Sequence, residues 1–189
     1  MGKSCLLCGL SFIDMGVSPQ SKARYKLVRE QLVPRPFEEV FSFFSRAENL
    51  EELTPGWLHF KILNIKPQPV QKGTIINYKL RLKGLPVRWC TEILEWNPPH
   101  GFVDFQQSGP YKLWHHTHRF IEEGKCTRIV DEVLYDLPFG LIGRIAHWLM
   151  VRRDVEKIFT FRESKIRELF GSAISHQQGR FSDTQFADR

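Results

Sequence analysis

The sequence predicts an α+β fold, with one antiparallel sheet and helices placed before and after most of its strands. Two observations carry this prediction. Between residues 59 and 135, short segments alternate apolar with polar residues and are separated by Gly and Pro turns, as in consecutive antiparallel strands. Residues 141–170 instead repeat apolar residues at helical spacing. A single domain is therefore expected over residues 24–171, between poorly ordered segments at 1–23 and 172–189 that lack such periodicity.

The N-terminal part of this domain predicts one strand followed by two short helices. Residues 24–32 alternate as a strand does, and the strand ends before Pro34. Pro36 suits the first position of a helix, and Glu38 and Glu39 suit the positive end of its dipole. A second short helix is expected over residues 47–53, because a Thr-Pro-Gly break follows it.

Further strands are expected in succession, which gives a sheet of about seven strands. Their approximate ranges are 59–65, 76–83, 88–96, 102–107, 109–120 and 127–135. The clearest is 76–83, because its apolar residues alternate strictly with Asn, Lys and Arg, the pattern of a half-buried strand.

Residues 141–170 are expected to form one long helix with an apolar stripe toward the sheet. About 30 residues of helix span ~45 Å, which suits a helix that lies across a wide sheet. The residues of the expected stripe are Ile142, Ile145, Leu149, Val155, Ile158, Phe159, Ile166 and Leu169.

The segment of residues 109–120, GPYKLWHHTHRF, holds the most chemical information. Strand alternation places His116 and His118 on one face, together with Trp114 and Phe120. The two imidazoles would project the same way about 7 Å apart, a spacing that metal sites can use. The alternation of neighbouring strands predicts which other residues share this buried face. The candidate ligand-binding residues there are Tyr78, Trp89, Thr91, Asp104, Gln106, Trp114, His116, His118, Asp131 and Tyr135.

The long helix adds one basic candidate to this face. Arg152 and Arg162 fall at or beside positions that continue the apolar stripe, so one of them could turn toward the sheet and pair with Asp104 or Asp131. Arg162 is therefore included among the candidate ligand-binding residues. Buried charges are costly unless they are paired, so these groups should bond one another or a polar group of a ligand.

Three interpretations of these polar residues stay open from the residues alone. They could orient a small amphipathic ligand in an aromatic pocket. They could carry out acid-base catalysis, with His116 or His118 as the base and Asp104 or Asp131 as its partner. They could also form a structural network without a ligand. A metal site is not predicted, because the spacing fixes no third ligand, and no cofactor is predicted.

Four segments of the chain form motifs: ENLxxLTPxWLxF at 48–60, GxPxxW at 84–89, GPYxxWxHxHxF at 109–120 and DxVxYxxPxG at 131–140. With these motifs the chain resembles the SRPBCC superfamily, the Bet v 1-like and START-like proteins of polyketide cyclase/dehydrase and lipid-transport type, and most closely its ligand-binding subgroup. The resemblance covers residues 24–170 and implies a helix-grip fold, a curved antiparallel sheet wrapped around a long C-terminal helix. It also implies a cavity for hydrophobic or amphipathic small molecules. It does not imply one activity, so a cyclase or dehydratase remains an alternative to binding or transport.

Composition narrows the expected partners and location. The net charge of +6 is spread along the chain without a nucleic-acid-binding motif, so no nucleic-acid partner is expected and at most weak peripheral membrane contact. Four cysteines in 189 residues are too few for a disulfide framework, which favours a reducing, cytoplasmic location. A monomer or dimer is expected. One alternative to ligand binding remains: the long helix and the basic surface bind a partner or a membrane, and the cavity has no function.

Overall fold

The computed structural model describes residues 23–171, so the segments expected to be poorly ordered lie almost wholly outside the described residues. The elements, in chain order, are β1 (Tyr25–Val33), α2 (Phe37–Phe44), η1 (Ala47–Leu50), η2 (Gly56–Leu58), β2 (Lys61–Lys66), β3 (Ile75–Leu82), β4 (Leu85–Asn97), β5 (Gly101–Ser108), β6 (Leu113–Glu123), β7 (Cys126–Asp136), α3 (Gly140–Ala146), η3 (His147–Val151) and α4 (Arg152–Phe170).

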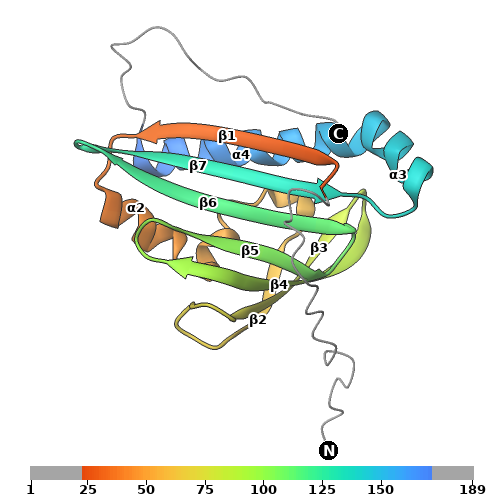
Figure 1. Cartoon of the computed structure of the whole chain (residues 1–189), viewed down its shortest axis with the longest axis horizontal. Helices are drawn as coiled ribbons and strands as arrows, with labels where there is room; N and C mark the ends of the chain where they lie inside the picture. Colours follow the sequence, from red (N-terminus) through yellow and green to blue (C-terminus); the bar gives the residue numbers. More distant parts are fainter. Residues whose placement is uncertain (1–22, 172–189) are drawn as a thin grey trace, which may run out of the picture.

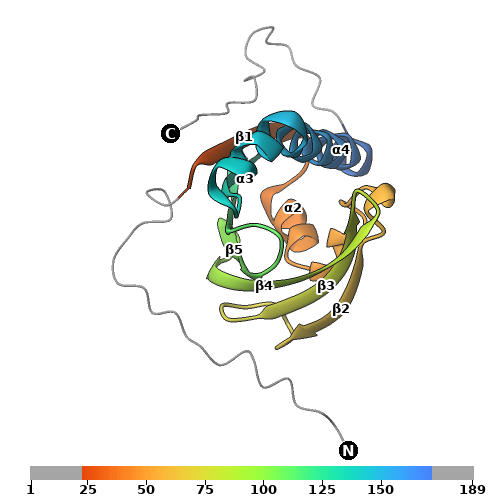
Figure 2. The ribbon, with the colours of Figure 1, turned by 90° about the vertical axis from the view of Figure 1, so that its right-hand side faces the viewer.

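The seven strands form one antiparallel sheet in the order β1-β7-β6-β5-β4-β3-β2. All neighbours except β1 and β7 are consecutive in the chain, so short hairpins build most of the sheet. The sheet curves around α2, and α4 runs along β1 and β7 across its open side (Figures 1 and 2). This confirms the predicted α+β, helix-grip arrangement.

Two elements near the N-terminus differ from their predicted form. The second short helix is only the 3-10 turn η1, which is followed by turns before η2. Asn49 donates from its side-chain amide to the carbonyl oxygen of Phe43 at 2.7 Å, which ties η1 to the end of α2. The alternation predicted for β2 is interrupted by a register shift between Ile62 and Asn64.

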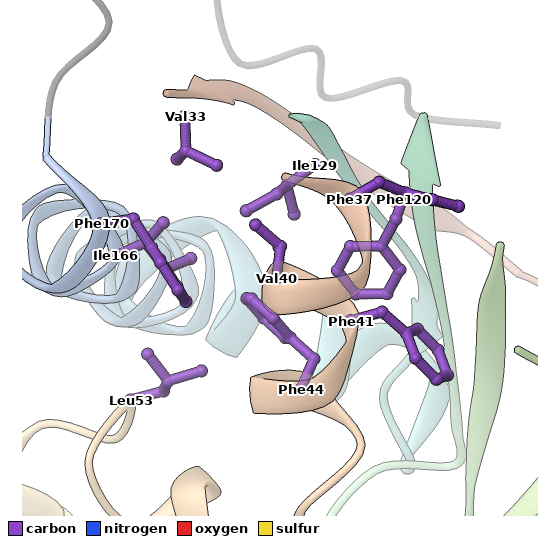
Figure 3. Close-up of a cluster of buried hydrophobic side chains, with 10 residues drawn as sticks. All are labelled: Val33, Phe37, Val40, Phe41, Phe44, Leu53, Phe120, Ile129, Ile166 and Phe170. Atoms are coloured by element: carbon purple, nitrogen blue, oxygen red, sulfur yellow. The ribbon is translucent and has the colours of Figure 1, made fainter. Parts of the chain in front are cut away.

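One end of the concave face is filled by a phenylalanine-rich core. Figure 3 shows α2 inserting its side chains between the strands β6 and β7 and the end of α4. Each fully buried large apolar side chain contributes about 1.5–3 kcal/mol relative to its exposed state. This end of the fold is therefore closed by packing. The cluster consists of Val33, Phe37, Val40, Phe41, Phe44, Leu53, Phe120, Ile129, Ile166 and Phe170.

The long C-terminal helix is continuous, but its first half does not face the sheet as predicted. A π-helical turn, η3, separates α3 from α4. Val155, Phe159 and Ile166 of α4 are buried, as expected for the stripe. Ile142, Ile145 and Leu149 were expected to belong to the same stripe and are instead 72%, 52% and 57% exposed.

The π-helical turn explains this correction, because it adds a residue to one turn and so shifts which residues face inward. In α3 and η3 the buried positions are Gly143 and His147. The imidazole of His147 stacks on Tyr25 with ring centroids 3.4 Å apart, and its Nε2 lies 2.9 Å from the Tyr135 hydroxyl oxygen. These contacts attach the first half of the helix to the sheet.

Candidate functional site

A cavity of about 190 Å³ lies between the sheet, η1 and α4, beside the phenylalanine core. This is many times the 10–15 Å³ that holds one buried water, and it is smaller than the roughly 300–1,000 Å³ of typical ligand pockets, so the cavity has room for a small ligand. Most of its wall is apolar. The aromatic side chains that line it include Phe60, Tyr78, Trp89, Trp96, Tyr111 and Trp114.

One wall of this cavity is charged. Asp104 on β5, His116 and His118 on β6 and Arg162 on α4 all line it. In the sheet, Asp104 pairs directly with His116, and His118 pairs directly with Asp131 on β7. Directly paired residues project to the same face of a sheet. Three adjacent strands therefore bring together the side chains of Asp104, His116, His118 and Asp131, as predicted from the alternation.

His118 lies between the two carboxylates. Its Nε2 is 2.8 Å from Asp104 Oδ2, and its Nδ1 is 2.8 Å from Asp131 Oδ1. An imidazole with an acceptor at both nitrogens is best satisfied as the doubly protonated cation, because both nitrogens then donate. Burial disfavours that charge, but the hydrogen bonds to Asp104 and Asp131 outweigh burial and raise the pKa of His118 above its ordinary value.

His116 has similar neighbours and the opposite shift. Its Nε2 is 3.0 Å from Asp131 Oδ1, and its Nδ1 is 3.4 Å from Asp104 Oδ2. Burial and the positive charge of His118, whose ring centroid is 3.8 Å away, lower the pKa of His116 below its ordinary value despite the two carboxylates. We therefore assign His116 as neutral, with Nε2 donating to Asp131.

Arg162 completes the cluster from the helix. Its Nε donates to Asp131 Oδ2 at 3.2 Å, and its side chain lies over the Phe44 ring, 5.2 Å from the centroid. Burial alone would raise the pKa of Asp131, but the charge of Arg162 and the hydrogen bonds from His116 and His118 hold it well below its usual range. Asp131 therefore stays ionised and binds three partners at once.

Asp104 is the most accessible acidic group of the cluster, with 19% of its side chain exposed against 6% for Asp131. Burial raises its pKa less than its electrostatic interactions with the two histidines and Arg162 and the hydrogen bond from His118 lower it, so its pKa lies below the ordinary value. Its Oδ2 accepts a hydrogen bond from His118 Nε2 and lies 3.4 Å from His116 Nδ1. Within residues 23–171, Asp104 Oδ1 accepts no hydrogen bond from a side chain or the backbone.

Comparison with known proteins identifies the family to which the chain belongs. The sequence profile of the family described as polyketide cyclase / dehydrase and lipid transport matches residues 33–159, which is more than half of the chain. The protein belongs to this family. A search of curated protein sequences found no match.

Solved structures of three other proteins share the fold. A START superfamily protein from Mycobacterium smegmatis is 14% identical, with a TM-score of 0.55, and covers 77% of this chain and 99% of its own. A norcoclaurine synthase from Thalictrum flavum is 16% identical, with a TM-score of 0.57, and covers 82% and 99%. The Zhui aromatase/cyclase from Streptomyces sp. R1128 is 10% identical, with a TM-score of 0.55, and covers 76% and 94%.

Several of the remaining predicted site residues also lie on the cavity wall of this family member. Tyr78, Trp89, Thr91 and Trp114 line it. The Tyr78 hydroxyl oxygen is 3.2 Å from Thr91 Oγ1, and burial raises the pKa of Tyr78 well above its usual value. Trp89 Nε1 is buried without an acceptor among the described residues. A buried N–H without an acceptor costs about 1–3 kcal/mol, which an acceptor on a ligand could offset.

Three predicted residues do not line the cavity. Asp131 lies behind the histidines and acts through them and Arg162. Tyr135 faces the same side of the sheet but sits at the end of β7, where its hydroxyl contacts His147. Gln106 bonds the backbone of the loop at Tyr111, with its Nε2 2.7 Å from the carbonyl oxygen and its Oε1 3.3 Å from the amide nitrogen. In each case the predicted face was correct, but Asp131 is covered by the histidines, and Tyr135 and Gln106 contact other parts of the protein.

Tyr111 is a cavity residue that the strand pattern did not select. It lies in the loop between β5 and β6, and its ring centroid is 4.7 Å from that of Trp114 and 5.5 Å from that of Trp89. Gln106 holds this loop, and a Cβ at Gly109 would collide with the Gln106 side chain. The GPY segment before β6 is the signal that could have identified Tyr111, because its Gly allows this close approach.

The cluster also contains a possible set of metal ligands. Asp104, His116 and His118 offer one ligand atom each within 4.8 Å of one another. A divalent cation at this place would have to replace the protons that His118 shares with two carboxylates, and it would lie close to the Arg162 guanidinium, whose terminal nitrogen is 3.4 Å from His118 Nδ1. The charges already present therefore favour the ion-paired cluster over a bound metal.

Proposed function

We propose that this protein binds an apolar or amphipathic small molecule in the cavity, with a polar hydrogen-bond donor of the ligand directed at Asp104. The observation that carries the proposal is the contrast within one cavity between aromatic and aliphatic walls and a single charged corner. Asp104 offers Oδ1, an ionised acceptor without a partner among the described residues, and a hydroxyl or amine group would satisfy it. A cavity of this size supports ligand binding over a purely structural role.

The family description supports the same class of ligand, because it names lipid transport and polyketide cyclisation. Both concern largely apolar molecules with a few oxygens. We further propose a cytoplasmic location and a monomeric or dimeric state.

Filling the cavity tests the proposal. Ile158 lines the cavity from α4, so Ile158→Trp should remove most of its volume. We expect this variant to lose binding of the uncharged fluorescent probe N-phenyl-1-naphthylamine, measured by fluorescence titration. The matched control is Ile121→Trp, on the outer face of β6, where the added ring meets solvent because Ile121 is 46% exposed. Equal binding by both variants would contradict the cavity as the site.

A specific observation favours acid-base catalysis as a second candidate. His116 is neutral, lines the cavity and is held by Asp131, which fixes its tautomer as a general base requires. Native mass spectrometry of the purified protein would identify a bound compound for this test. His116→Gln should then abolish turnover of that compound with retained affinity if His116 is a base, whereas loss of affinity alone supports binding.

A further inference from the structure

The surface of α3 and η3 exposes a continuous group of large apolar side chains. We call it the α3–η3 patch, and its six main residues are between 52% and 80% exposed. Single exposed apolar residues are common, but a group of neighbours on one surface marks a binding surface. The six residues are Phe139, Leu141, Ile142, Ile145, Trp148 and Leu149.

The packing of the helix keeps this patch turned away from the sheet. Gly143 faces inward, and a Cβ there would collide with the carbonyl of Pro138, so the helix approaches the chain before it closely. His147 is 5% exposed and is held by Tyr25 and Tyr135. Burying the patch against this domain would break these contacts. Figure 1 shows α3 projecting past the end of β7, where the rest of the fold does not cover it.

The charged side chains of the segment that forms the patch have one sign. From residue 137 to residue 153 the sequence contains Arg144, Arg152 and Arg153 and no Asp or Glu. The first carboxylates after this stretch are already paired, Asp154 with Lys83 at 2.9 Å and Glu156 with Arg152 at 3.4 Å. An apolar surface with a basic border is complementary to a membrane whose surface is negatively charged.

We infer that the α3–η3 patch docks on the surface of an anionic lipid bilayer. The apolar side chains would enter the boundary between headgroups and acyl chains, where Trp148 has a favoured position, and the arginines would contact the phosphates. None of the helices in the described part of the chain is long and apolar enough to cross a bilayer. The contact is therefore peripheral, which extends the weak membrane contact expected from the net charge to a defined surface.

This surface adjoins one edge of the cavity. The helix continues from η3 into α4, whose Val155 and Ile158 line the cavity. On the opposite wall, Leu82 at the end of β3 lines it too, and the next residue, Lys83, bonds Asp154. Docking would bring this edge of the cavity next to the membrane, where apolar ligands are dissolved. This link between docking and ligand uptake rests on the proposed function.

Vesicle sedimentation with the full chain tests the docking surface. We expect the protein to sediment with vesicles of mixed phosphatidylcholine and phosphatidylserine and to be released as the NaCl concentration is raised. The double variant Ile142→Glu/Trp148→Glu should bind these vesicles about tenfold or more weakly, and Arg153→Gln about fivefold more weakly. The control Ile121→Glu changes an exposed apolar residue on β6, and it should bind like the unaltered protein.

The outcomes separate this inference from the proposed function. Circular dichroism and N-phenyl-1-naphthylamine binding should be unchanged in the double variant, so retained probe binding with lost vesicle binding supports docking. Equal vesicle binding by the double variant and the control would overturn it. It would also be overturned if the unaltered protein ignores vesicles and forms a dimer that the double variant disrupts in sedimentation velocity, because the patch would then join two copies.

Discussion

The two halves of the C-terminal helix carry similar apolar side chains in opposite surroundings. Phe159 and Ile166 of α4 are 5% and 2% exposed, whereas Ile142 and Trp148 of α3 and η3 are 72% and 78% exposed. The difference comes from the π-helical turn between them, which moves Gly143 and His147 onto the inner side. The spacing of apolar residues therefore predicts that a helix forms. Whether the helix is regular at the junction of its two halves decides which residues of each half face the sheet.

The two arginines that were candidates to pair with Asp104 or Asp131 also lie in opposite surroundings. Arg162 lies on the buried side of α4, between Phe159 and Ile166, and bonds Asp131. Arg152 lies at the junction with η3, where its Nε bonds Glu156 and its side chain is 51% exposed. One helix thus presents one arginine to the core and the other to solvent.

The largest expected effect is on stability and would test the comparison directly. Phe159→Ala should lower the free energy of unfolding by about 4 kcal/mol, because it removes a buried ring and leaves space in the core. Leu149→Ala should change it by less than about 0.5 kcal/mol, because that side chain is 57% exposed. Urea denaturation monitored by circular dichroism measures both. A similar loss in the two variants would show that the patch is covered in solution.

The second-largest expected effect on stability is that of replacing the buried arginine of the helix. Arg162→Gln should destabilise the fold by about 3 kcal/mol, because it leaves Asp131 buried with less compensating charge. Arg152→Gln should cost about 0.5 kcal/mol or less, since its pair with Glu156 is exposed. The same denaturation experiment compares them, and equal effects would refute the assignment of Arg162 to a core position.

The pH dependence of stability tests whether His118, which faces the buried half of the helix, is charged. The raised pKa of His118 stabilises the fold fully below its unfolded value of about 6.5, and this stabilisation is lost as the pH rises through the folded pKa. The destabilisation caused by His118→Gln should therefore shrink as the pH is raised above about 6.5. Each unit by which the pKa is raised corresponds to about 1.4 kcal/mol. Denaturation midpoints across a pH series would reveal a constant difference if His118 is not charged.

The same variant should act on its neighbour. The charge of His118 is one of the causes that lower the pKa of His116, while Asp104 and Asp131 act to raise it. His118→Gln should therefore raise the pKa of His116. Titration of the His116 ring protons by NMR measures this shift, and an unchanged or lower pKa would contradict the assigned charges.

The smallest expected effect concerns the link between the helix and the β3–β4 hairpin. Lys83→Gln removes an exposed ion pair with Asp154, so stability should fall by only about 0.2–1 kcal/mol. Release of N-phenyl-1-naphthylamine in stopped-flow experiments should become faster, because this pair joins α4 to the β3–β4 hairpin next to the cavity residues Leu82 and Val155. Arg167→Gln, which removes an exposed pair with Glu163 on the same helix, is the control and should leave release unchanged.

Strand alternation was sufficient to predict most of the charged wall. It placed Asp104, His116, His118 and Asp131 on one face, and the register of β5, β6 and β7 brings them into contact. It could not predict that Tyr135 lies beyond the cavity, because alternation determines the face of a residue and not how far along the strand the cavity extends.

The α3–η3 patch could not be predicted from helical spacing. A π-helical turn changes the inward-facing position by one residue, and no local preference of the surrounding residues identifies it in advance. The signal that remains in the sequence is the pair Gly143 and His147, a small residue and a polar ring that interrupt the apolar residues of this segment at its two buried positions.

The charged wall has a consequence for what the cavity can accept. Two carboxylates, one imidazolium, one guanidinium and one neutral imidazole sum to zero formal charge, and His116 can take up one proton where it stands, between two acceptors. The wall can therefore become a net cation without moving a side chain. An acidic ligand would bind together with a proton, and an alcohol would bind without one, so the enthalpy of binding would depend on the ionisation enthalpy of the buffer only for the acid.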